Sequence, residues 1–330
     1  MIKLTVIVPT RNRSSYLTET LDSIALQSLD KDSFEVLVID NGSTDDTKKV
    51  VESFYCKIPH LRYFFESKPG LHVGRHIGYC EATSDILVFA DDDIIAFPTW
   101  LEGMQESFRD EDVMLVGGKD LPRYEVTPPF WILEKWYELT EYGHSMPELS
   151  LIDLGDEIKQ IPAYYVYGCN YGIRKRVLDE TKGFHPDGMP FELIQYRGDG
   201  EFGVNRYIEE HHLKVLYCPK ASVYHQVPKS RLTVDYFCKR AFCQGVEMSY
   251  SDIRYGINHK TASKGFKYWL KQILGINMLN SLSQIKSMAE KTDIEKQIEK
   301  SRITGYQYHQ SKYHSDSDLR NWVHRDCYID

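Results

Sequence analysis

Asp91, Asp92 and Asp93 come directly after the apolar run Ile86–Ala90. Such a run predicts a buried strand, and side chains alternate along an extended chain, so Asp91 and Asp93 are expected to point one way and Asp92 another. Two carboxylates on one side of a strand end are suitable ligands for a hard divalent cation, which in turn could neutralise a diphosphate. A solvated acidic turn before the next helix is the alternative for this pattern.

Two further polar clusters follow apolar runs near the N-terminus. Leu4–Val8 is followed by Thr10–Arg13, and Phe34–Ile39 is followed by Asp40–Ser43. In an α/β protein, ligands bind at the carboxyl ends of the parallel strands, which meet at one edge of the sheet. We therefore expect these two clusters and the three aspartates to converge on one crevice.

Predicted strands and helices alternate over the first ninety residues. Further strands are predicted at 62–65 and 86–90, with a helix at 73–82 between them. This alternation predicts an α/β fold with a mostly parallel central sheet that is flanked by helices. The segment 122–168 is interpreted as an irregular, aromatic-rich insertion, and the chain after 228 is predicted to be mostly helical. The remaining predicted elements are strands at 164–169, 215–217 and 222–225 and a helix at 202–210.

Composition limits the function classes. The chain has 330 residues, of which 42% are hydrophobic and 27% charged, as is typical of a globular protein. Its net charge of −8 argues against nonspecific nucleic-acid binding, which needs a surplus of Lys and Arg, so nucleic acid is not an expected partner. The seven cysteines are scattered without a CxxC pair, which favours reduced thiols and a cytoplasmic location over a disulfide framework or a zinc knuckle.

Membrane contact is expected to be peripheral. The N-terminal segment lacks the ordered charged, apolar and small-residue regions of a secretion signal. No stretch approaches the roughly 20 consecutive apolar residues that span a bilayer, so any association would be peripheral. For a protein in the cytoplasm it would be at the inner face of the cell membrane. The segment 264–274, KGFKYWLKQIL, is compatible with an interfacial helix, and a packed amphipathic helix is the alternative.

Five motifs in the same order resemble those of family 2 of the inverting glycosyltransferases, which adopt the GT-A fold. The resemblance covers about residues 3–228. It implies a metal-dependent enzyme that moves a sugar from a nucleotide-sugar, expected to be a UDP-sugar, to an acceptor hydroxyl on a glycan or a lipid-linked glycan, as in polysaccharide biosynthesis. The motifs are 6–13 (VIVPTRNR), 38–45 (VIDNGSTD), 70–78 (GLHVGRHIG), 91–93 (DDD) and 198–203 (GDGEFG).

The expected domain organisation follows the extent of the resemblance. Residues 1–228 are predicted to form the GT-A glycosyltransferase domain, with a nucleotide-binding half at about 1–120 and an acceptor half at about 121–228. Residues 229–330 are predicted to form a helical C-terminal extension. The oligomeric state is left open by the sequence.

The resemblance implies a nucleotide site near the first two strands. Pro9, Thr10 and Arg11 would line the base pocket, Asp40 would accept a hydrogen bond from the uracil ring, and Arg75 would face the nucleotide. Each has an alternative in ordinary structure. Asp40 followed by Asn-Gly is also typical of a turn, and the glycines of the third motif could simply allow close helix packing.

The resemblance also implies roles for the acidic triplet. Asp91 would contact the ribose, Asp92 would belong to the same donor site, and Asp93 would bind the metal. His225 would be the partner ligand, because many relatives carry a metal-binding histidine at the end of the corresponding strand. Neutral imidazole suits Mn²⁺ better than Mg²⁺, and either ion is an expected cofactor. A surface histidine at a strand end is the alternative.

Inverting transfer needs a general base within reach of the acceptor hydroxyl. Relatives carry Glu-Asp where this chain has Gly198 and Asp199, so Asp199 would be the base, with Glu201 as the second candidate. A helix N-cap role is the alternative for Asp199.

Two rival functions remain. A nucleotidyltransferase would need a Gly-rich, Lys-containing phosphate loop, which residues 11–13 do not supply, and a non-catalytic module would bind a nucleotide-sugar or glycan without turnover.

Overall fold

The computed structural model describes residues 3–257 and 292–329, so the segment 264–274 lies outside the described residues. The chain divides into two compact units. Unit 1 contains Met1–Gly188, Gly200–Lys229 and Cys327–Asp330, and unit 2 contains Met189–Asp199 and Ser230–Asp326. These units are defined by contacts and each combines several segments of the chain. The domain boundary predicted between residues 228 and 229 therefore stays a prediction. None of the helices described in these two ranges has the length and apolar character needed to cross a bilayer.

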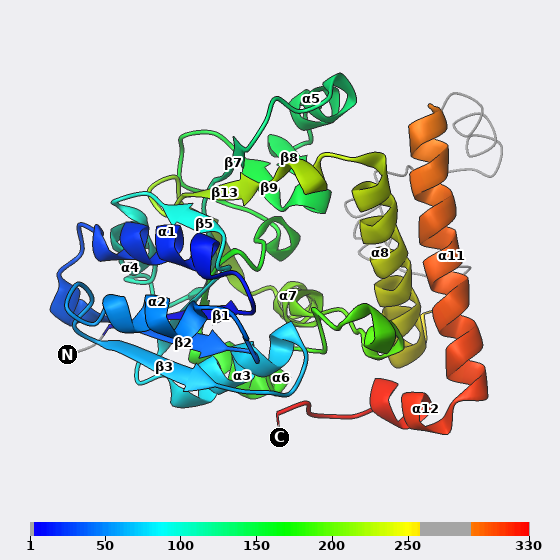
Figure 1. The fold of residues 1–330 in the computed structure, drawn as a ribbon, viewed down its shortest axis with the longest axis horizontal. Coiled ribbons are helices and arrows are strands. Elements are labelled where there is room, and N and C mark those ends of the chain that lie inside the picture. The colour runs from blue at the N-terminus through cyan, green and yellow to red at the C-terminus, as the bar shows by residue number, and fades with distance from the viewer. Residues whose placement is uncertain (1–2, 258–291, 330) are drawn as a thin grey trace. The chain divides into compact units, whose positions relative to one another are not determined.

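Unit 1 is built on an eight-stranded sheet (Figure 1). The neighbours β4, β1, β2 and β3 are mutually parallel, as the sequence predicts. β11 runs antiparallel to both β4 and β6, so the sheet as a whole is mixed. In sheet order the strands are β10 (Lys159–Gln160), β12 (Lys214–Tyr217), β6 (Val113–Gly117), β11 (Asn170–Arg174), β4 (Ile86–Ala90), β1 (Leu4–Thr10), β2 (Phe34–Asp40) and β3 (Leu61–Phe65).

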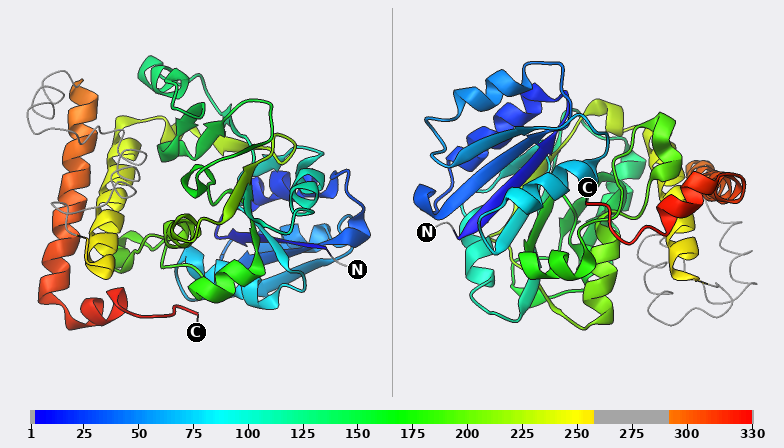
Figure 2. Two further views of the ribbon diagram at one scale, coloured as in Figure 1. Left: turned by 180° about the vertical axis from the view of Figure 1, so that it is seen from behind. Right: turned by 90° about the horizontal axis from the view of Figure 1, so that it is seen from below.

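Helices cover both faces of the parallel part of this sheet. α1 (Ser14–Ala25) and α2 (Thr47–Ser53) lie on one face and α3 (Leu71–Glu81) on the other (Figure 2, right). α3 lies close to β1 because its glycines face that strand, and a Cβ added at Gly78 would lie 2.2 Å from Ile7. Close packing, the alternative weighed for the third motif, is therefore a real function of these glycines. The other helices of unit 1 are α4 (Trp100–Ser107), α5 (Phe130–Tyr137), α6 (Lys175–Thr181) and α7 (Glu201–Glu210).

A second, five-stranded sheet in unit 1 corrects the expectation of an irregular insertion at 122–168. β7, β8 and β9 come from that region and belong to this sheet. The strand predicted at 164–169 is also wrong: a 3-10 turn, η3 (Ala163–Tyr165), follows Pro162, and the strand begins only at Asn170. In sheet order the strands are β5 (Ile94–Ala96), β13 (Val223–Val227), β7 (Asp120–Tyr124), β9 (Leu151–Asp153) and β8 (His144–Met146).

The described part of unit 2 is helical, which confirms the prediction for the chain after 228 in that part. Its elements are η4 (Phe191–Tyr196), α8 (Val234–Tyr255), α11 (Asp293–Ser315) and α12 (Ser317–Val323). α8 and α11 run side by side in the same direction (Figures 1 and 2). Their backbones touch, since a Cβ added at Gly305 would lie 2.0 Å from the carbonyl oxygen of Phe242. The same holds for Gly245 of α8, whose added Cβ would lie 2.0 Å from the carbonyl oxygen of Arg302.

Candidate active site

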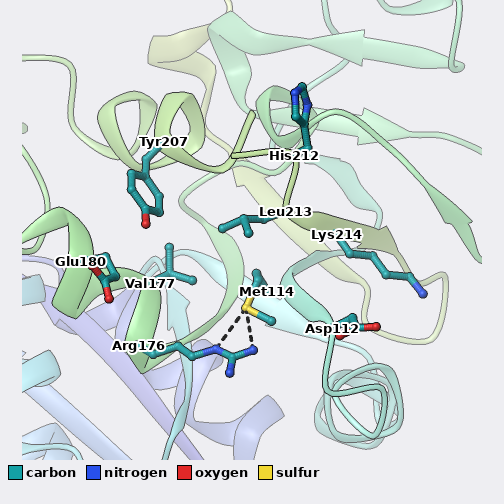
Figure 3. A pocket seen from close by; sticks show the side chains of 9 residues that line it. All are labelled: Asp112, Met114, Arg176, Val177, Glu180, Tyr207, His212, Leu213 and Lys214. Carbon is teal, nitrogen blue, oxygen red and sulfur yellow. Dashed lines mark hydrogen bonds between the residues drawn. The ribbon is translucent and has the colours of Figure 1, made fainter. Parts of the chain in front are cut away.

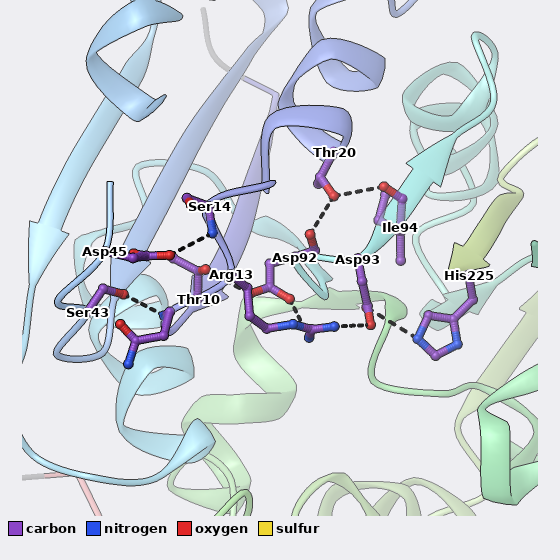
Figure 4. Close-up of polar contacts among 11 residues, drawn as sticks. Thr10, Arg13, Ser14, Thr20, Ser43, Asp45, Asp92, Asp93, Ile94 and His225 are labelled. Atoms are coloured by element: carbon purple, nitrogen blue, oxygen red, sulfur yellow. Dashed lines mark hydrogen bonds and ion pairs between the residues drawn. The ribbon is translucent and has the colours of Figure 1, made fainter. Parts of the chain in front are cut away.

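The three polar clusters predicted at strand ends meet at one edge of the sheet (Figure 4). Thr10, the last residue of β1, pairs in register with Asp40, the last residue of β2. The Thr10 hydroxyl donates to Oδ2 of Asp92 over 2.7 Å, and the backbone N–H of Asn12 donates to the Ser43 hydroxyl over 2.9 Å. These contacts confirm that the clusters converge on one site.

Among residues 3–257 and 292–329, Asp91, Asp93 and His225 form a cluster that could hold a metal ion. Each offers one ligand atom, and these atoms lie within 4.8 Å of one another. Oδ1 of Asp93 is 3.2 Å from Nε2 of His225. Two ligand atoms at right angles on a cation, with bonds of about 2.1 Å, would be about 3 Å apart. The spacing therefore fits neighbouring ligands of one divalent ion.

The tautomer of His225 supports the same interpretation. Its Nδ1 is 2.8 Å from the carbonyl oxygen of Leu149, which can only accept, so Nδ1 carries the proton. With the proton on Nδ1, Nε2 faces Oδ1 of Asp93, with which it pairs when protonated and beside which it can bind a cation when deprotonated. The carbonyl fixes the ring as an outer-sphere partner does in metal sites.

The position of His225 corrects one detail of the sequence prediction. His225 lies in the middle of β13, paired with Ile94 on one side and Pro122 on the other, and it is buried. It is therefore neither at a strand end nor on the surface, which removes the alternative of a surface histidine.

Arg13 is a site residue to which sequence reasoning assigned no role. Its guanidinium donates to Oδ1 of Asp92 and to Oδ2 of Asp93, each over 2.6 Å (Figure 4). Burial alone would lower the pKa of Arg13, but these two carboxylates outweigh it and raise the pKa. In the sequence, Arg13 could be recognised only as a member of the polar cluster that follows β1. The sequence does not indicate that Asp92 and Asp93 are its partners. Arg13 thus holds the carboxylates of both aspartates in one orientation. The remaining oxygen of Asp93, Oδ1, faces His225.

Burial of the acidic triplet disfavours the charged form of its carboxylates. Burial, followed by the charge of Asp93, raises the pKa of Asp91. Burial also raises the pKa of Asp92 to about 7, although the nearby guanidinium opposes the shift. Buried carboxylates with raised pKa values are stabilised in their charged form when a cation binds. The donor set, the spacing and the charge together fit a divalent metal.

The side chain of Asp40 is held in one orientation. Its Oδ1 accepts from the backbone N–H of Ser43 and its Oδ2 from the hydroxyl of Tyr63, each over 2.7 Å. Burial, followed by this bond to Asp40, raises the pKa of the Tyr63 hydroxyl, so Tyr63 stays a donor. The turn suggested by the sequence is therefore present, and sequence reasoning missed Tyr63. Of the other predicted pocket residues, Pro9 is buried against Gly74, and Arg11 is exposed.

Arg75 lies in the interior of unit 1. Its guanidinium pairs with Oε2 of Glu201 over 3.0 Å and lies over the ring of Phe184. Burial alone would lower the pKa of Arg75, but the charges of Glu201 and then Asp91 raise it. The structure therefore brings Arg75, Glu201 and Asp91 into one electrostatic group, with the charge of Glu201 balanced by the guanidinium.

Asp199 is buried within unit 2, where its Oδ2 accepts from the hydroxyl of Ser251 on α8 over 2.9 Å. The N-cap alternative for Asp199 is wrong, because the N-cap of α7 is Gly200 and makes no side-chain capping bond.

A separate pocket of about 570 Å³ lies at the opposite ends of the strands of the main sheet, away from the acidic triplet. Figure 3 shows the side chains that line it. Met114 and Lys214, near the starts of β6 and β12, form part of its wall, and β6 runs parallel to β4 through β11. The pocket therefore lies at the amino ends of strands whose carboxyl ends face the acidic triplet. It contains none of the predicted site residues. Its lining is Asp112, Met114, Arg176, Val177, Glu180, Tyr207, His212, Leu213 and Lys214.

Sequence comparison identifies relatives along most of the chain. The family model described as glycosyl transferase family 2 matches residues 5–182. The glucosyl-dolichyl phosphate glucuronosyltransferase of Haloferax volcanii is 22% identical over 288 residues, which cover 86% of this chain and 87% of that protein. Other curated glycosyltransferases align over shorter stretches, and the chain spans 38% or less of their length.

Two solved structures share the fold. The mannosyltransferase PcManGT from Pyrobaculum calidifontis, in complex with GDP-Man and Mn²⁺, has a TM-score of 0.58 at 19% identity, with 99% of this chain and 84% of that chain covered. Residues 1–349 of Staphylococcus aureus TarS, in complex with UDP-GlcNAc, have a TM-score of 0.52 at 16% identity, with 95% and 92% covered. These neighbours confirm the expected GT-A-type fold with its helical C-terminal region. The family model spans more than half of the chain, and the chain therefore belongs to glycosyl transferase family 2.

Proposed function

We propose that this protein transfers a sugar from a nucleotide-sugar to a hydroxyl of a glycan or a lipid-linked glycan, with inversion at the anomeric carbon. The observation that carries the proposal is the cluster of Asp91, Asp93 and His225, which lies at the same sheet edge as Thr10 and Asp40. Solved structures of the same fold bind GDP-Man and UDP-GlcNAc, which supports a nucleotide-sugar as the donor class. UDP is the proposed nucleotide, since the resemblance pairs Asp40 with a uracil ring.

Asp91, Asp93 and His225 would hold a divalent cation, Mn²⁺ or Mg²⁺. When bound there, the cation would offset the charge that develops on the leaving diphosphate. The residues of the chain do the remaining work at this edge. Arg13 keeps the carboxylates of Asp92 and Asp93 in place, and the carbonyl of Leu149 holds a proton on Nδ1 of His225, so that Nε2 is the ring nitrogen that would bind the cation.

We propose Asp199 as the general base and Glu201 as a partner of Arg75. Glu201 forms an ion pair with Arg75, whereas Oδ2 of Asp199 accepts a hydrogen bond from the neutral hydroxyl of Ser251. In the proposed reaction, the acceptor oxygen bonds to the anomeric carbon as the bond to the diphosphate breaks. The acceptor proton passes to Asp199, and the nucleoside diphosphate leaves.

A lipid-linked acceptor is supported by one relative. The protein aligned over most of this chain is named as a glucosyl-dolichyl phosphate glucuronosyltransferase, and its acceptor therefore carries a lipid. We propose that the protein acts on such an acceptor at the inner face of a membrane, in the cytoplasm.

A thermal-shift screen with nucleotide-sugars tests the donor and the metal together. The purified chain is heated with UDP- and GDP-sugars, in Mn²⁺ or in EDTA. A ligand at 100 times its dissociation constant stabilises the fold by about 2.7 kcal/mol. We expect a rise in melting temperature with a UDP-sugar that EDTA abolishes. A flat response to every nucleotide-sugar would overturn the proposal.

A turnover assay separates the rival functions. Incubation with a UDP-sugar and no acceptor is expected to release UDP slowly, by transfer to water, and Asp199→Asn is expected to abolish this release. Release of UMP would identify a nucleotidyltransferase. Binding of the donor without release of either nucleotide, also after lipid-linked and free glycan acceptors are added, would identify a binding module.

A further inference from the structure

We propose that Ser251 and Glu247, both on α8, act as positioning residues for the candidate base Asp199. The inference rests on the proposed role of Asp199 and assigns a function to a helix outside the family motifs. All of the contacts that carry it lie within unit 2.

The first contact is a hydrogen bond to the carboxylate itself. The hydroxyl of Ser251 donates to Oδ2 of Asp199 over 2.9 Å, and each residue is only 3% exposed. A buried donor aimed at one oxygen of a carboxylate restricts the rotation of that side chain. The Ser251 donor is neutral, so this bond orients the carboxylate without forming an ion pair with it.

The second contact fixes the backbone of the same segment. Arg197, two residues before Asp199, donates to Oε1 of Glu247 over 2.7 Å, and both side chains are largely buried. Glu247 and Ser251 are four residues apart on α8 and so lie on the same face of the helix. One face of α8 therefore holds Arg197 and Asp199 at once.

The rest of the helical unit contacts the residues just before these two. The indole N–H of Trp322 on α12 donates to the carbonyl oxygen of Tyr196 over 2.8 Å. The hydroxyl of Tyr308 on α11 is 3.5 Å from the side-chain oxygen of Gln195. Residues 195–197 and 199 thus each contact a C-terminal helix.

α8 supplies a matched control for the role of Ser251. Ser249 is also buried on this helix, and its hydroxyl lies 2.7 Å from Nδ1 of His309 on α11. Ser249→Ala and Ser251→Ala therefore each remove one buried hydroxyl and one hydrogen bond of similar length. They differ in that only Ser251 contacts the candidate base.

The experiment compares kcat and the donor KM of the full chain carrying Ser251→Ala, Ser249→Ala, Ser251→Thr, Glu247→Gln or Asp199→Asn. A hydrogen bond to a charged group corresponds to about a tenfold or larger change, so we expect kcat of Ser251→Ala to fall at least about tenfold, with the donor KM nearly unchanged. Glu247→Gln is expected to lower kcat likewise. Ser249→Ala should keep kcat near the wild-type value, and Ser251→Thr, which retains the hydroxyl, should recover most of it.

Two results would overturn the inference while leaving the proposed function intact. The first is a wild-type kcat for Ser251→Ala and Glu247→Gln when Asp199→Asn is inactive. The second is an equal loss of kcat in Ser249→Ala and Ser251→Ala, which would show a general loss of packing. A wild-type kcat for Asp199→Asn would instead overturn the proposed base, and the positioning role with it. If Ser251→Ala does not fold, the kcat values of Glu247→Gln and Ser251→Thr, compared with those of the wild type and Ser249→Ala, decide whether α8 positions Asp199.

Discussion

Nε2 of His225 lies 3.2 Å from Oδ1 of Asp93, and Nδ1 of the same ring lies 2.8 Å from the carbonyl oxygen of Leu149. The ring is therefore fixed through Nδ1 by the backbone, with Nε2 directed at a carboxylate. His225 belongs to β13, and Asp93 directly precedes β5, the strand that pairs with β13 in the second sheet.

Replacement of His225 by Ala should weaken metal binding. Loss of one nitrogen ligand removes part of the coordination, and we expect the affinity for Mn²⁺ to fall by about 10- to 100-fold, in the range seen when the supporting groups of metal sites are changed. Electron paramagnetic resonance of free Mn²⁺ measures this without turnover. His211→Ala is the control, since that ring is exposed and stacks on Tyr207. Equal Mn²⁺ affinity in both variants would contradict the assignment.

Replacement of Arg13 by Met should have opposite effects on the metal-free protein and on metal binding. The carboxylates of Asp92 and Asp93 lose their countercharge, so the metal-free fold is expected to lose about 1–3 kcal/mol of stability, because the ion pair is only partly exposed. A divalent cation then meets more negative charge, so the rise in melting temperature on adding Mn²⁺ should be larger than in the wild type. An equal or smaller rise would show that Arg13 does not compete with the cation for these carboxylates.

Asp120 should make the metal-free protein less stable as the pH rises. This residue is buried at the start of β7 and accepts from Nδ2 of Asn170 over 3.0 Å. Burial raises the pKa of Asp120 from its ordinary value of 3.8 to about 7. Between these pH values the folded state keeps a proton that the unfolded state has lost, so the free energy of unfolding falls as the pH rises from about 4 to about 7. Denaturant titrations at pH 5 and pH 8 measure the slope.

The matched variant for this prediction is Asp120→Asn. It cannot ionise, and we expect its stability to change less between pH 5 and pH 8 than that of the wild type. An unchanged slope in Asp120→Asn would assign the pH dependence to other carboxylates.

Gly78 and Gly74 of α3 should differ in their tolerance of alanine. A Cβ at Gly78 would lie 2.2 Å from a methyl carbon of Ile7, whereas a Cβ at Gly74 would lie 3.1 Å from the nearest carbon of Pro9. Gly78→Ala therefore has to displace α3 from β1, which we expect to cost about 1–3 kcal/mol, as overpacking in a core does. Gly74→Ala needs only a small shift. Chemical denaturation of both variants checks the order, and equal losses would show that α3 moves freely on the sheet.

The parallel half of the sheet was predictable because its strands are continuous apolar runs. The runs before Thr10, Asp40 and Asp91 are buried strands that end where polar residues begin, and a parallel arrangement brings such ends together. Residue order alone therefore predicted the edge of the sheet at which the site lies.

Short strands and long-range contacts explain what the sequence did not predict. β5, β8 and β9 have three residues each, which is too short for an alternation of apolar and polar residues to be recognised in the sequence. The buried residues just before Asn170 suit a 3-10 turn as well as a strand. The pairing of Arg13 with Asp93 joins residues 80 positions apart, and that of Ser251 with Asp199 joins residues 52 positions apart. Neither contact leaves a pattern in the sequence.

The reciprocal backbone contact at Gly245 and Gly305 affects how variation in the C-terminal third should be interpreted. A side chain at either position would meet a carbonyl oxygen of the opposite helix at 2.0 Å, with no flexible group to yield. In a saturation library screened for activity, these two codons should be depleted of every alternative residue, although neither lies in a family motif. Their intolerance would reflect backbone geometry rather than chemistry, and a search for catalytic groups based on mutational sensitivity alone would misassign them.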